Sequence, residues 1–250
     1  MPMAKNLVEL RDVYKIYGEG RESEVRALDG VSLTIGKGEF VAVVGQSGSG
    51  KSTMMNVLGC LDIPTRGTYL LGGTDVRELT DKELSHIRNK QIGFIFQQYN
   101  LIQSLTVLEN VELPLIYQGV NADDRRDMAL EALARVGLAN RIKHRPVEMS
   151  GGQQQRVAIA RALVNDPVMI LADEATGNLD TRTSFEILTL FQKLHREGRT
   201  IVFVTHNPEI AEFCSRNIVL RDGRIVEDVQ NTQVRSAKEV LDSLPQDSGQ

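Results

Sequence analysis

A buried strand that runs directly into a glycine-rich loop is the feature that most constrains this fold. Residues 40–44 read FVAVV, a continuous apolar run typical of a strand covered on both faces. Residues 45–52 read GQSGSGKS and match the pattern G-x-x-x-x-G-K-S/T, and a helix-favouring stretch follows. An accidental glycine turn would not need this order of strand, loop and helix. The order predicts a phosphate-binding loop in a parallel α/β sheet.

The residue types in this loop indicate which chemistry it serves. Glycines let the backbone wrap a phosphate chain, and the N–H groups and helix dipole bind it. We expect Lys51 to reach the β- and γ-phosphates of a nucleotide and the Ser52 hydroxyl to ligate Mg²⁺.

Two further apolar strands end in polar residues. Residues 168–172 read VMILA and precede Asp173 and Glu174, whereas residues 200–204 read TIVFV and precede His206. An amphipathic helix from about 183 to 196 separates them, which is the βαβ pattern of a parallel sheet. Turn capping by Asp173, or an ordinary strand-end histidine, would explain single residues. Near a triphosphate, however, we expect Asp173 to hold the metal and Glu174 to polarise the attacking water.

A second glycine-rich stretch predicts another anion-binding site that has no lysine. Residues 149–156 read MSGGQQQR, where a serine and two glycines precede a helix-favouring run. Exposed N–H groups at a helix N-terminus favour anions. An ordinary helix cap with a flexible lead-in is the alternative for this stretch alone.

The rest of the chain sets limits on fold and function. Val31, Leu33 and Ile35 alternate with polar residues, as in a half-exposed antiparallel strand, whereas residues 106–145 read as helical. The stretch RNIVLRDGRIVED predicts a hairpin, and a short helix follows from about Val234, with residues 245–250 frayed.

The net charge of −4 argues against nucleic acid as a partner, and no apolar run is long enough to span a membrane.

The ordered set of motifs resembles the nucleotide-binding domain of ABC transporters, from about residue 7 to residue 228. The set comprises the phosphate-binding loop, Gln97, SGGQ, the Asp–Glu pair, NLD at 178–180 and His206. The resemblance implies an α/β P-loop NTPase fold with a mainly parallel core sheet and an N-terminal antiparallel subdomain. An α-helical subdomain, about 100–160, would be inserted in a domain of residues 1–230, and residues 231–250 would add a short helix and tail.

The resemblance also implies roles for individual residues. Glu174, His206 and Gln97 would be catalytic, and Ser52, Gln97 and Asp173 would hold Mg²⁺. Tyr17 would stack on adenine, although a plain strand tyrosine is the alternative. The other residues expected to bind ATP are Gly45, Gln46, Ser47, Gly48, Ser49, Gly50, Lys51, Ser52, Thr53, Ser150, Gly151, Gly152, Gln153 and Asp180.

The family resemblance answers why one chain needs two phosphate sites. It implies a head-to-tail dimer, in which SGGQ of one copy closes over the γ-phosphate held by the other. One departure is Ala175, where the family usually has proline after the catalytic glutamate. Proline fixes φ near −65° and alanine does not, so we expect a looser loop between Glu174 and Asp180.

Local sequence stretches such as SGGQQQRVAIARALVNDP resemble those of one branch of the family, the lipoprotein-releasing and macrolide-exporting ATPases of bacteria. This implies a membrane permease, with periplasmic partners, driven by mechanical transmission from the cytoplasmic face of the membrane. We expect the permease on a separate chain or beyond Gln250. A regulator of cell-wall hydrolases fits almost as well. A DNA-repair member of the family fits less well because the sequence has no sustained heptads, and a translation member because it has one cassette. A small-molecule kinase fits less well because no acceptor pocket is evident.

Overall fold

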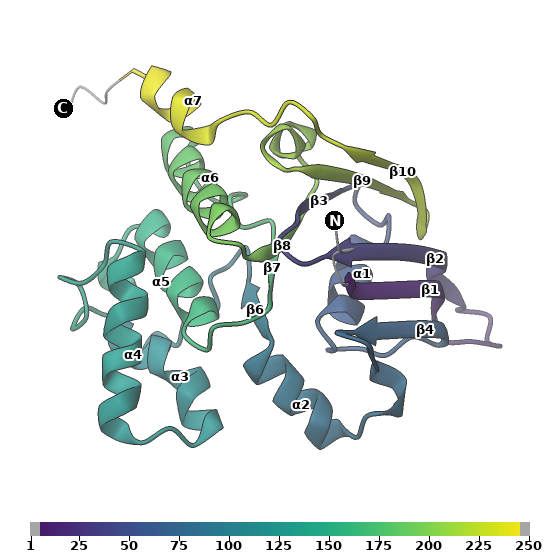
Figure 1. Ribbon diagram of the computed structural model, residues 1–250, viewed down its shortest axis with the longest axis horizontal. Coiled ribbons are helices and arrows are strands. Elements are labelled where there is room, and N and C mark those ends of the chain that lie inside the picture. The colour runs from purple at the N-terminus through teal and green to yellow at the C-terminus, as the bar shows by residue number, and fades with distance from the viewer. Residues whose placement is uncertain (1–5, 246–250) are drawn as a thin grey trace, which may run out of the picture.

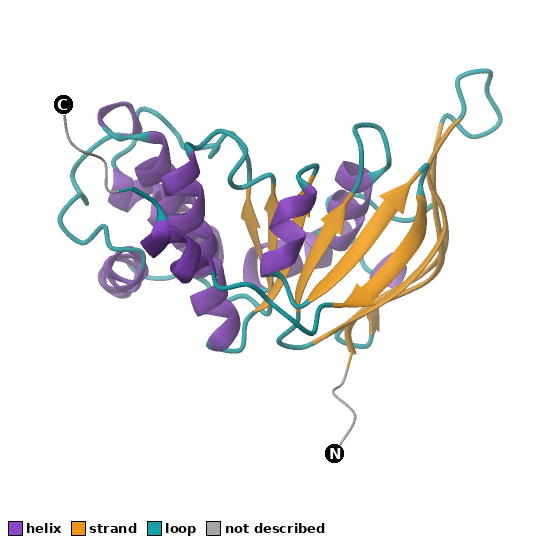
Figure 2. Ribbon diagram, turned by 90° about the horizontal axis from the view of Figure 1, so that it is seen from above, coloured by secondary structure: helices purple, strands orange, loops and turns teal. Residues whose placement is uncertain are grey.

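The computed structural model describes residues 6–245, which form two β-sheets and a group of helices (Figure 1). The parallel sheet lies between the antiparallel sheet on one side and helices on the other (Figure 2). The expected fraying of residues 245–250 falls, apart from Pro245, outside the described residues.

The first sheet is antiparallel and has the strand order β2-β1-β4-β5. Its strands are β1 (Asn6–Tyr17), β2 (Val25–Gly36), β4 (Arg66–Leu71) and β5 (Thr74–Asp75). Val31, Leu33 and Ile35 of β2 are all buried, and the residues between them, Ser32 and Thr34, are exposed. The alternation in the sequence therefore predicted the buried face of β2 correctly.

The second sheet has the order β10-β9-β3-β8-β7-β6, with β10 antiparallel to β9 and all other neighbours parallel. The predicted hairpin is present, with its turn at Asp222–Gly223. The strands of this sheet are β3 (Phe40–Val44), β6 (Ile92–Ile95), β7 (Met169–Asp173), β8 (Thr200–Thr205), β9 (Arg216–Arg221) and β10 (Arg224–Gln230).

The central strands are apolar between their end residues because each face of the sheet contributes to a different core. In β3, Phe40 and Ala42 belong to one hydrophobic cluster, and Val41 and Val43 belong to the other. Strands β7 and β8 divide their residues between the same two clusters. Successive side chains of a strand point to opposite faces, so a sheet covered on both faces favours apolar residues at every inner position of these strands.

Most helices occupy the stretches that the sequence assigned to them, whereas α2 (Asp81–Lys90) was not predicted. The region 106–145 forms α3 (Val107–Gln118) and α4 (Ala122–Arg135), and the predicted C-terminal helix starts at Ala237, three residues later than expected. The other helices are α1 (Lys51–Leu58), α2 (Asp81–Lys90), α5 (Gly151–Leu163), α6 (Thr181–Arg196) and α7 (Ala237–Ser243), with short 3-10 turns at Val76–Glu78, Pro146–Glu148 and Pro208–Phe213.

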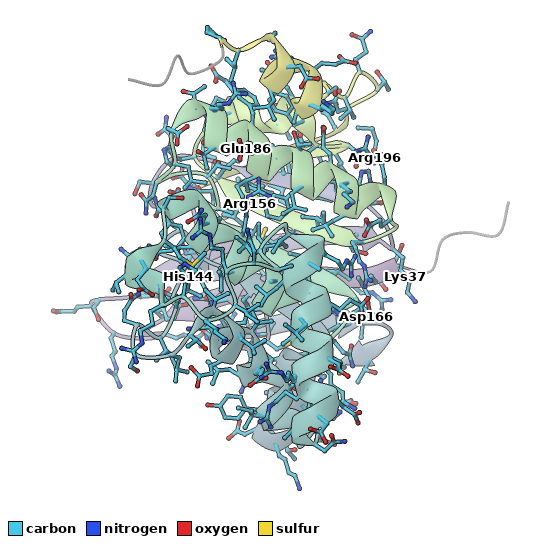
Figure 3. All side chains as sticks on the ribbon, turned by 90° about the vertical axis from the view of Figure 1, so that its left-hand side faces the viewer. Lys37, His144, Arg156, Asp166, Glu186 and Arg196 are labelled. Atoms are coloured by element: carbon cyan, nitrogen blue, oxygen red, sulfur yellow. The ribbon has the colours of Figure 1, made fainter. Side chains whose placement is uncertain are left out.

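Helices α3, α4 and α5 lie together, on the opposite side of the parallel sheet from β1 and β2 (Figure 1). An ion pair between Arg156 of α5 and Glu186 of α6, with an N–O distance of 3.0 Å, links this group to α6 (Figure 3). Within residues 6–245, no helix combines the length and the apolarity needed to cross a membrane.

The two-sided core makes a direct prediction for stability. Phe203 of β8 is fully buried and packs edge-on against Phe191 of α6, with ring centroids 5.3 Å apart. We expect Phe203→Ala to lower the free energy of unfolding by about 3–5 kcal/mol, because it removes a large side chain and leaves a cavity. Urea unfolding monitored by circular dichroism measures this loss. Val226→Ala, at a 52% exposed position, is the control and should change the midpoint little; equal losses would contradict the two-sided core.

Candidate active site

The phosphate-binding loop joins β3 to α1 and packs against backbone on two sides. Gly50 has a φ of 101°, and a Cβ added there would collide with the carbonyl oxygen of Ala27 in β2. A Cβ at Gly45 would collide with the carbonyl oxygen of Leu220 in β9. Gly48 has a φ of 79° and open space around it, so glycine is needed there for the positive φ and not for a close contact. The three glycines of the motif therefore meet different requirements.

The turn between β9 and β10 also holds this loop, which the sequence did not indicate. Gly223 N donates to Ser49 O at 3.0 Å, and Asp29 N of β2 donates to Gly223 O at 2.9 Å. Arg224 and Asp29 add an ion pair at 2.7 Å. Three segments that are distant in the sequence thus fix the shape of the loop.

Lys51 is the first residue of α1 and is only 7% exposed. Its Nζ donates to the carbonyl oxygens of Gly45 at 2.7 Å and Gln46 at 2.8 Å, which folds the side chain back over its own loop. Burial lowers the pKa of the ammonium group, although the charges of Glu174 and Asp173 oppose this effect. The side chain is therefore held beside the two carboxylates.

A cavity of about 710 Å³ brings the loop and the carboxylate pair together. The sequence predicted Asp173, Glu174, His206 and much of the loop, but it missed the contributions from β2 and from the β9–β10 turn. The lining residues are Val25, Arg26, Ala27, Ser47, Gly48, Gly50, Lys51, Ser52, Thr53, Asp173, Glu174, His206, Asp222 and Gly223.

Strand register brings Glu174 and His206 side by side. Asp173, at the end of β7, pairs with Val204 of β8, so Glu174 lies level with the end of β8. Glu174 has a φ of 45°, and its N–H still donates to Val204 O at 2.8 Å. His206 Nδ1 lies 2.6 Å from Glu174 Oε1, so the imidazole N–H donates to the carboxylate. The ring can thus orient the carboxylate, which is left with a second oxygen to accept a proton from a water molecule.

The donors near Asp173 fit a magnesium ion. Burial raises the pKa of the Asp173 carboxyl, the charge of Glu174 adds to the effect, and Lys51 opposes it. A buried carboxylate of this kind favours a nearby cation. The Ser52 hydroxyl lines the same cavity, and both groups offer the oxygen ligands that Mg²⁺ prefers. Ser52 and Asp173 are therefore the residues that could hold the metal.

Gln97, which was predicted to join the metal site, does not line this cavity in the structure. Its Nε2 donates to Asn178 Oδ1 at 3.4 Å, and Asn178 Nδ2 donates to Gln97 O at 3.2 Å. Gly177 approaches so closely that an added Cβ would lie 2.8 Å from Gln97 Nε2. The sequence had grouped Asn178 only with the NLD motif, and its contact with Gln97 was not foreseen.

Asp180 and Tyr17 also lie outside the lining of the cavity. Asp180 is the N-cap of α6 and accepts hydrogen bonds from Thr183 N at 2.9 Å and Thr183 Oγ1 at 2.6 Å, which lower the pKa of its carboxyl. Tyr17 is 41% exposed and pairs in register with Val25, a lining residue. Its hydroxyl lies 3.1 Å from Asp62 Oδ2. Tyr17 is thus next to a lining residue in the sheet, and Lys15 Nζ lies 5.1 Å from the centroid of its ring.

The signature segment, Ser150–Gln153, forms the capped start of α5. Ser150 Oγ accepts from Gln153 N at 3.3 Å, and Gln153 Oε1 accepts from Ser150 N at 3.1 Å. A Cβ at Gly152 would collide with Thr183 Cγ2, and one at Gly151 would lie 2.8 Å from the Tyr99 hydroxyl. None of these four residues lines the cavity of the phosphate-binding loop. The two predicted phosphate sites are therefore separate within one chain.

Comparisons with solved structures agree with this architecture. The dimeric structure of MJ0796, a bacterial ABC transporter cassette, has a TM-score of 0.81 and 48% identity, over 90% of this chain and 98% of that one. A second structure of that cassette, with the same scores, is a dimeric post-hydrolysis state bound to ADP and Pi.

Sequence comparisons identify the family. A family model described as ABC transporter matches residues 28–177. An uncharacterized ABC transporter ATP-binding protein of Thermotoga maritima is 57% identical over 221 residues, 88% of this chain and 94% of that protein. The macrolide export ATP-binding/permease protein MacB of Hyphomonas neptunium is 54% identical over 231 residues, 92% of this chain but only 36% of that protein. The chain thus spans about a third of its macrolide-export relatives. It belongs to the ABC transporter family, as an ATP-hydrolysing cassette.

Proposed function

We propose that this chain hydrolyses ATP as a head-to-tail homodimer and thereby drives a membrane permease. The observation that carries the proposal is the separation of the cavity from the signature segment in a single chain. A helix N-terminus with free N–H groups favours an anion, but the phosphate-binding loop of the same chain lies elsewhere. A second copy, turned head to tail, would supply the missing half of each site. The dimeric structures of the MJ0796 cassette support the association of two copies.

In the proposed reaction, water attacks the γ-phosphate of ATP and gives ADP and phosphate. Lys51 and the loop N–H groups would bind the β- and γ-phosphates. Ser52 and Asp173 would hold Mg²⁺, which neutralises phosphate charge when it is bound. Glu174 would take the proton of the attacking water, and His206, already bonded to Glu174 Oε1, would orient the carboxylate.

The membrane partner is proposed to dock on the α2–α3 groove, a cavity of about 320 Å³ whose lining includes Arg88, Phe94, Pro114, Tyr117 and Arg161. Tyr117 is 81% exposed, and Phe94 stacks on Phe96 with centroids 5.8 Å apart. An exposed aromatic side chain beside half-buried phenylalanines on a groove is typical of an interaction site.

The finer part of the proposal concerns the kind of permease. The relatives named for macrolide export favour a permease for macrolide or peptide export or for lipoprotein release, on the inner face of the cell membrane. Closure of the dimer around ATP would push on this permease by mechanical transmission, because a ligand shared between two chains binds the closed dimer more tightly than the open one.

The shared site predicts the behaviour of a hydrolysis-deficient variant. We expect Glu174→Gln to bind ATP, to lose at least about 10²-fold in turnover as a general base is removed, and to accumulate as a dimer with ATP and Mg²⁺. Light scattering after size exclusion measures the mass. The double variant Lys51→Ala/Glu174→Gln is the control and should stay monomeric. A Glu174→Gln protein that is monomeric at saturating nucleotide would contradict the shared site.

The loop after Glu174 has Ala175 where the family usually has proline. The contacts of Ala175 show how a proline would be accommodated there. Ala175 is 2% exposed, and its carbonyl oxygen accepts a hydrogen bond from Gln155 Nε2 at 2.7 Å. Among the hydrogen bonds of residues 6–245, none is donated by Ala175 N. Proline, which lacks the backbone N–H, would therefore break no hydrogen bond of the loop.

Ala175→Pro should raise the melting temperature by about 1–3 °C, since it restricts the unfolded chain by about 0.4–1 kcal/mol. Ala175→Gly, which frees the backbone, is the matched control and should lower it. Differential scanning fluorimetry and the ATPase rate are the two measurements. Unchanged melting temperature together with unchanged turnover in Ala175→Pro would show that alanine leaves the loop no looser.

A further inference from the structure

We propose that Gln155 is a positioning residue that holds Glu174 in place from the body of the signature helix. The inference rests on the proposed role of Glu174 as the base. It assigns a function to a residue outside the Ser150–Gln153 segment and outside the cavity.

The contact between Gln155 and the catalytic loop is buried and has one orientation. Gln155 is fully buried in α5, and its Nε2 donates to Ala175 O at 2.7 Å. Its Oε1 is buried and has no hydrogen-bond partner. The opposite amide orientation would place two acceptor oxygens against each other, so the nitrogen must face Ala175. A buried amide that leaves its own oxygen unpaired is costly, which points to a requirement at the carbonyl it contacts.

That carbonyl belongs to Ala175, the residue after Glu174, and the backbone of Glu174 adopts a left-handed conformation. A non-glycine residue with a φ of 45° persists only where its surroundings hold it. Val204 O accepts from Glu174 N at 2.8 Å, and Glu174 O accepts from Gly177 N at 2.8 Å. The bond from Gln155 completes the set on the following residue. Strand β8, the loop itself and helix α5 therefore fix the peptide units on both sides of Glu174.

Gln155 lies one helical turn after Gly151, within the helix that begins at the signature segment. A helix moves as a rigid element, so a displacement of the start of α5 reaches the Ala175 carbonyl through one side chain. Gln155 thereby connects the half-site offered to a partner copy with the half-site that holds the base in its own chain. Loss of the contact should misplace Glu174 without altering the loop that binds the nucleotide.

The first test separates kcat from nucleotide binding. Gln155→Met keeps the length and bulk of the side chain but cannot donate a hydrogen bond. We expect kcat to fall by about 10–10²-fold, as misplacement of a reacting group by about 1 Å does, with the ATP dissociation constant changed less than about 3-fold. Gln155→Asn, which is too short to reach Ala175 O, should behave alike and serves if the first variant folds poorly.

Asn165 provides a matched control. Its Nδ2 donates to Asn89 O at 2.8 Å, and its Oδ1 is also buried without a partner, but it lies just beyond the end of α5 and away from Glu174. Asn165 lines the α2–α3 groove, so this control is measured on the cassette without a permease, where Asn165→Leu should lower thermal stability to a similar degree and leave kcat unchanged. Equal losses of kcat in the Asn165 and Gln155 variants would overturn the inference in favour of a purely structural role.

A double-mutant cycle tests whether Gln155 acts through Glu174. In a Glu174→Gln background, adding Gln155→Met should change the residual rate less than about 2-fold, because coupled residues are not additive. The same fold loss in both backgrounds would overturn the inference. Wild-type hydrolysis by Glu174→Gln would instead refute the proposed base. An inactive Glu174→Gln beside a fully active Gln155→Met would leave that base standing and refute only the positioning role.

Discussion

Everything at this site depends on the in-register parallel pairing of β3, β8 and β7. Val44 pairs with Thr205, and Val204 pairs with Asp173, so the three strands end at one edge. The residues that follow them are Gly45, His206 and Glu174. No side chain has to reach across the molecule, since the backbone ladder brings a phosphate-binding loop, a base and an imidazole to the same place. The central position of these strands also explains their apolar sequence, because both faces of the sheet are covered.

The shape of the phosphate-binding loop depends on segments from both sheets. The loop contacts the backbone of β2 at Ala27 and that of β9 at Leu220, and the turn at Gly223 is bonded to both Ser49 and Asp29. The antiparallel sheet and the C-terminal hairpin are therefore parts of the nucleotide site. Because each approach is between main-chain atoms, a glycine is required on one side while almost any residue serves on the other.

This asymmetry explains what could be predicted from the sequence. Strands, helices and the hairpin follow from local periodicity and turn residues, and the motif glycines have a fixed spacing, so both could be predicted. The lining by Arg26 and Asp222, the bond of Gln97 to Asn178 and the bond of Gln155 to Ala175 depend on which distant segments meet. No spacing rule carries that information, because a backbone carbonyl accepts a hydrogen bond whatever its side chain is. Asp180 shows a further limit, since helix capping and ligand binding favour the same residue type.

The glycine pair of the signature segment has to be interpreted with the same care. Gly151 lies against the Tyr99 hydroxyl and Gly152 against Thr183, so a side chain at either position is resisted within one chain. Loss of activity on substitution of either glycine would therefore not distinguish phosphate binding from helix packing. Nucleotide-dependent association of two chains does distinguish them, because packing of α5 on α6 is present in each chain with or without a partner. The case for a shared site thus depends on what ATP does to the assembly, and much less on the presence of the glycines.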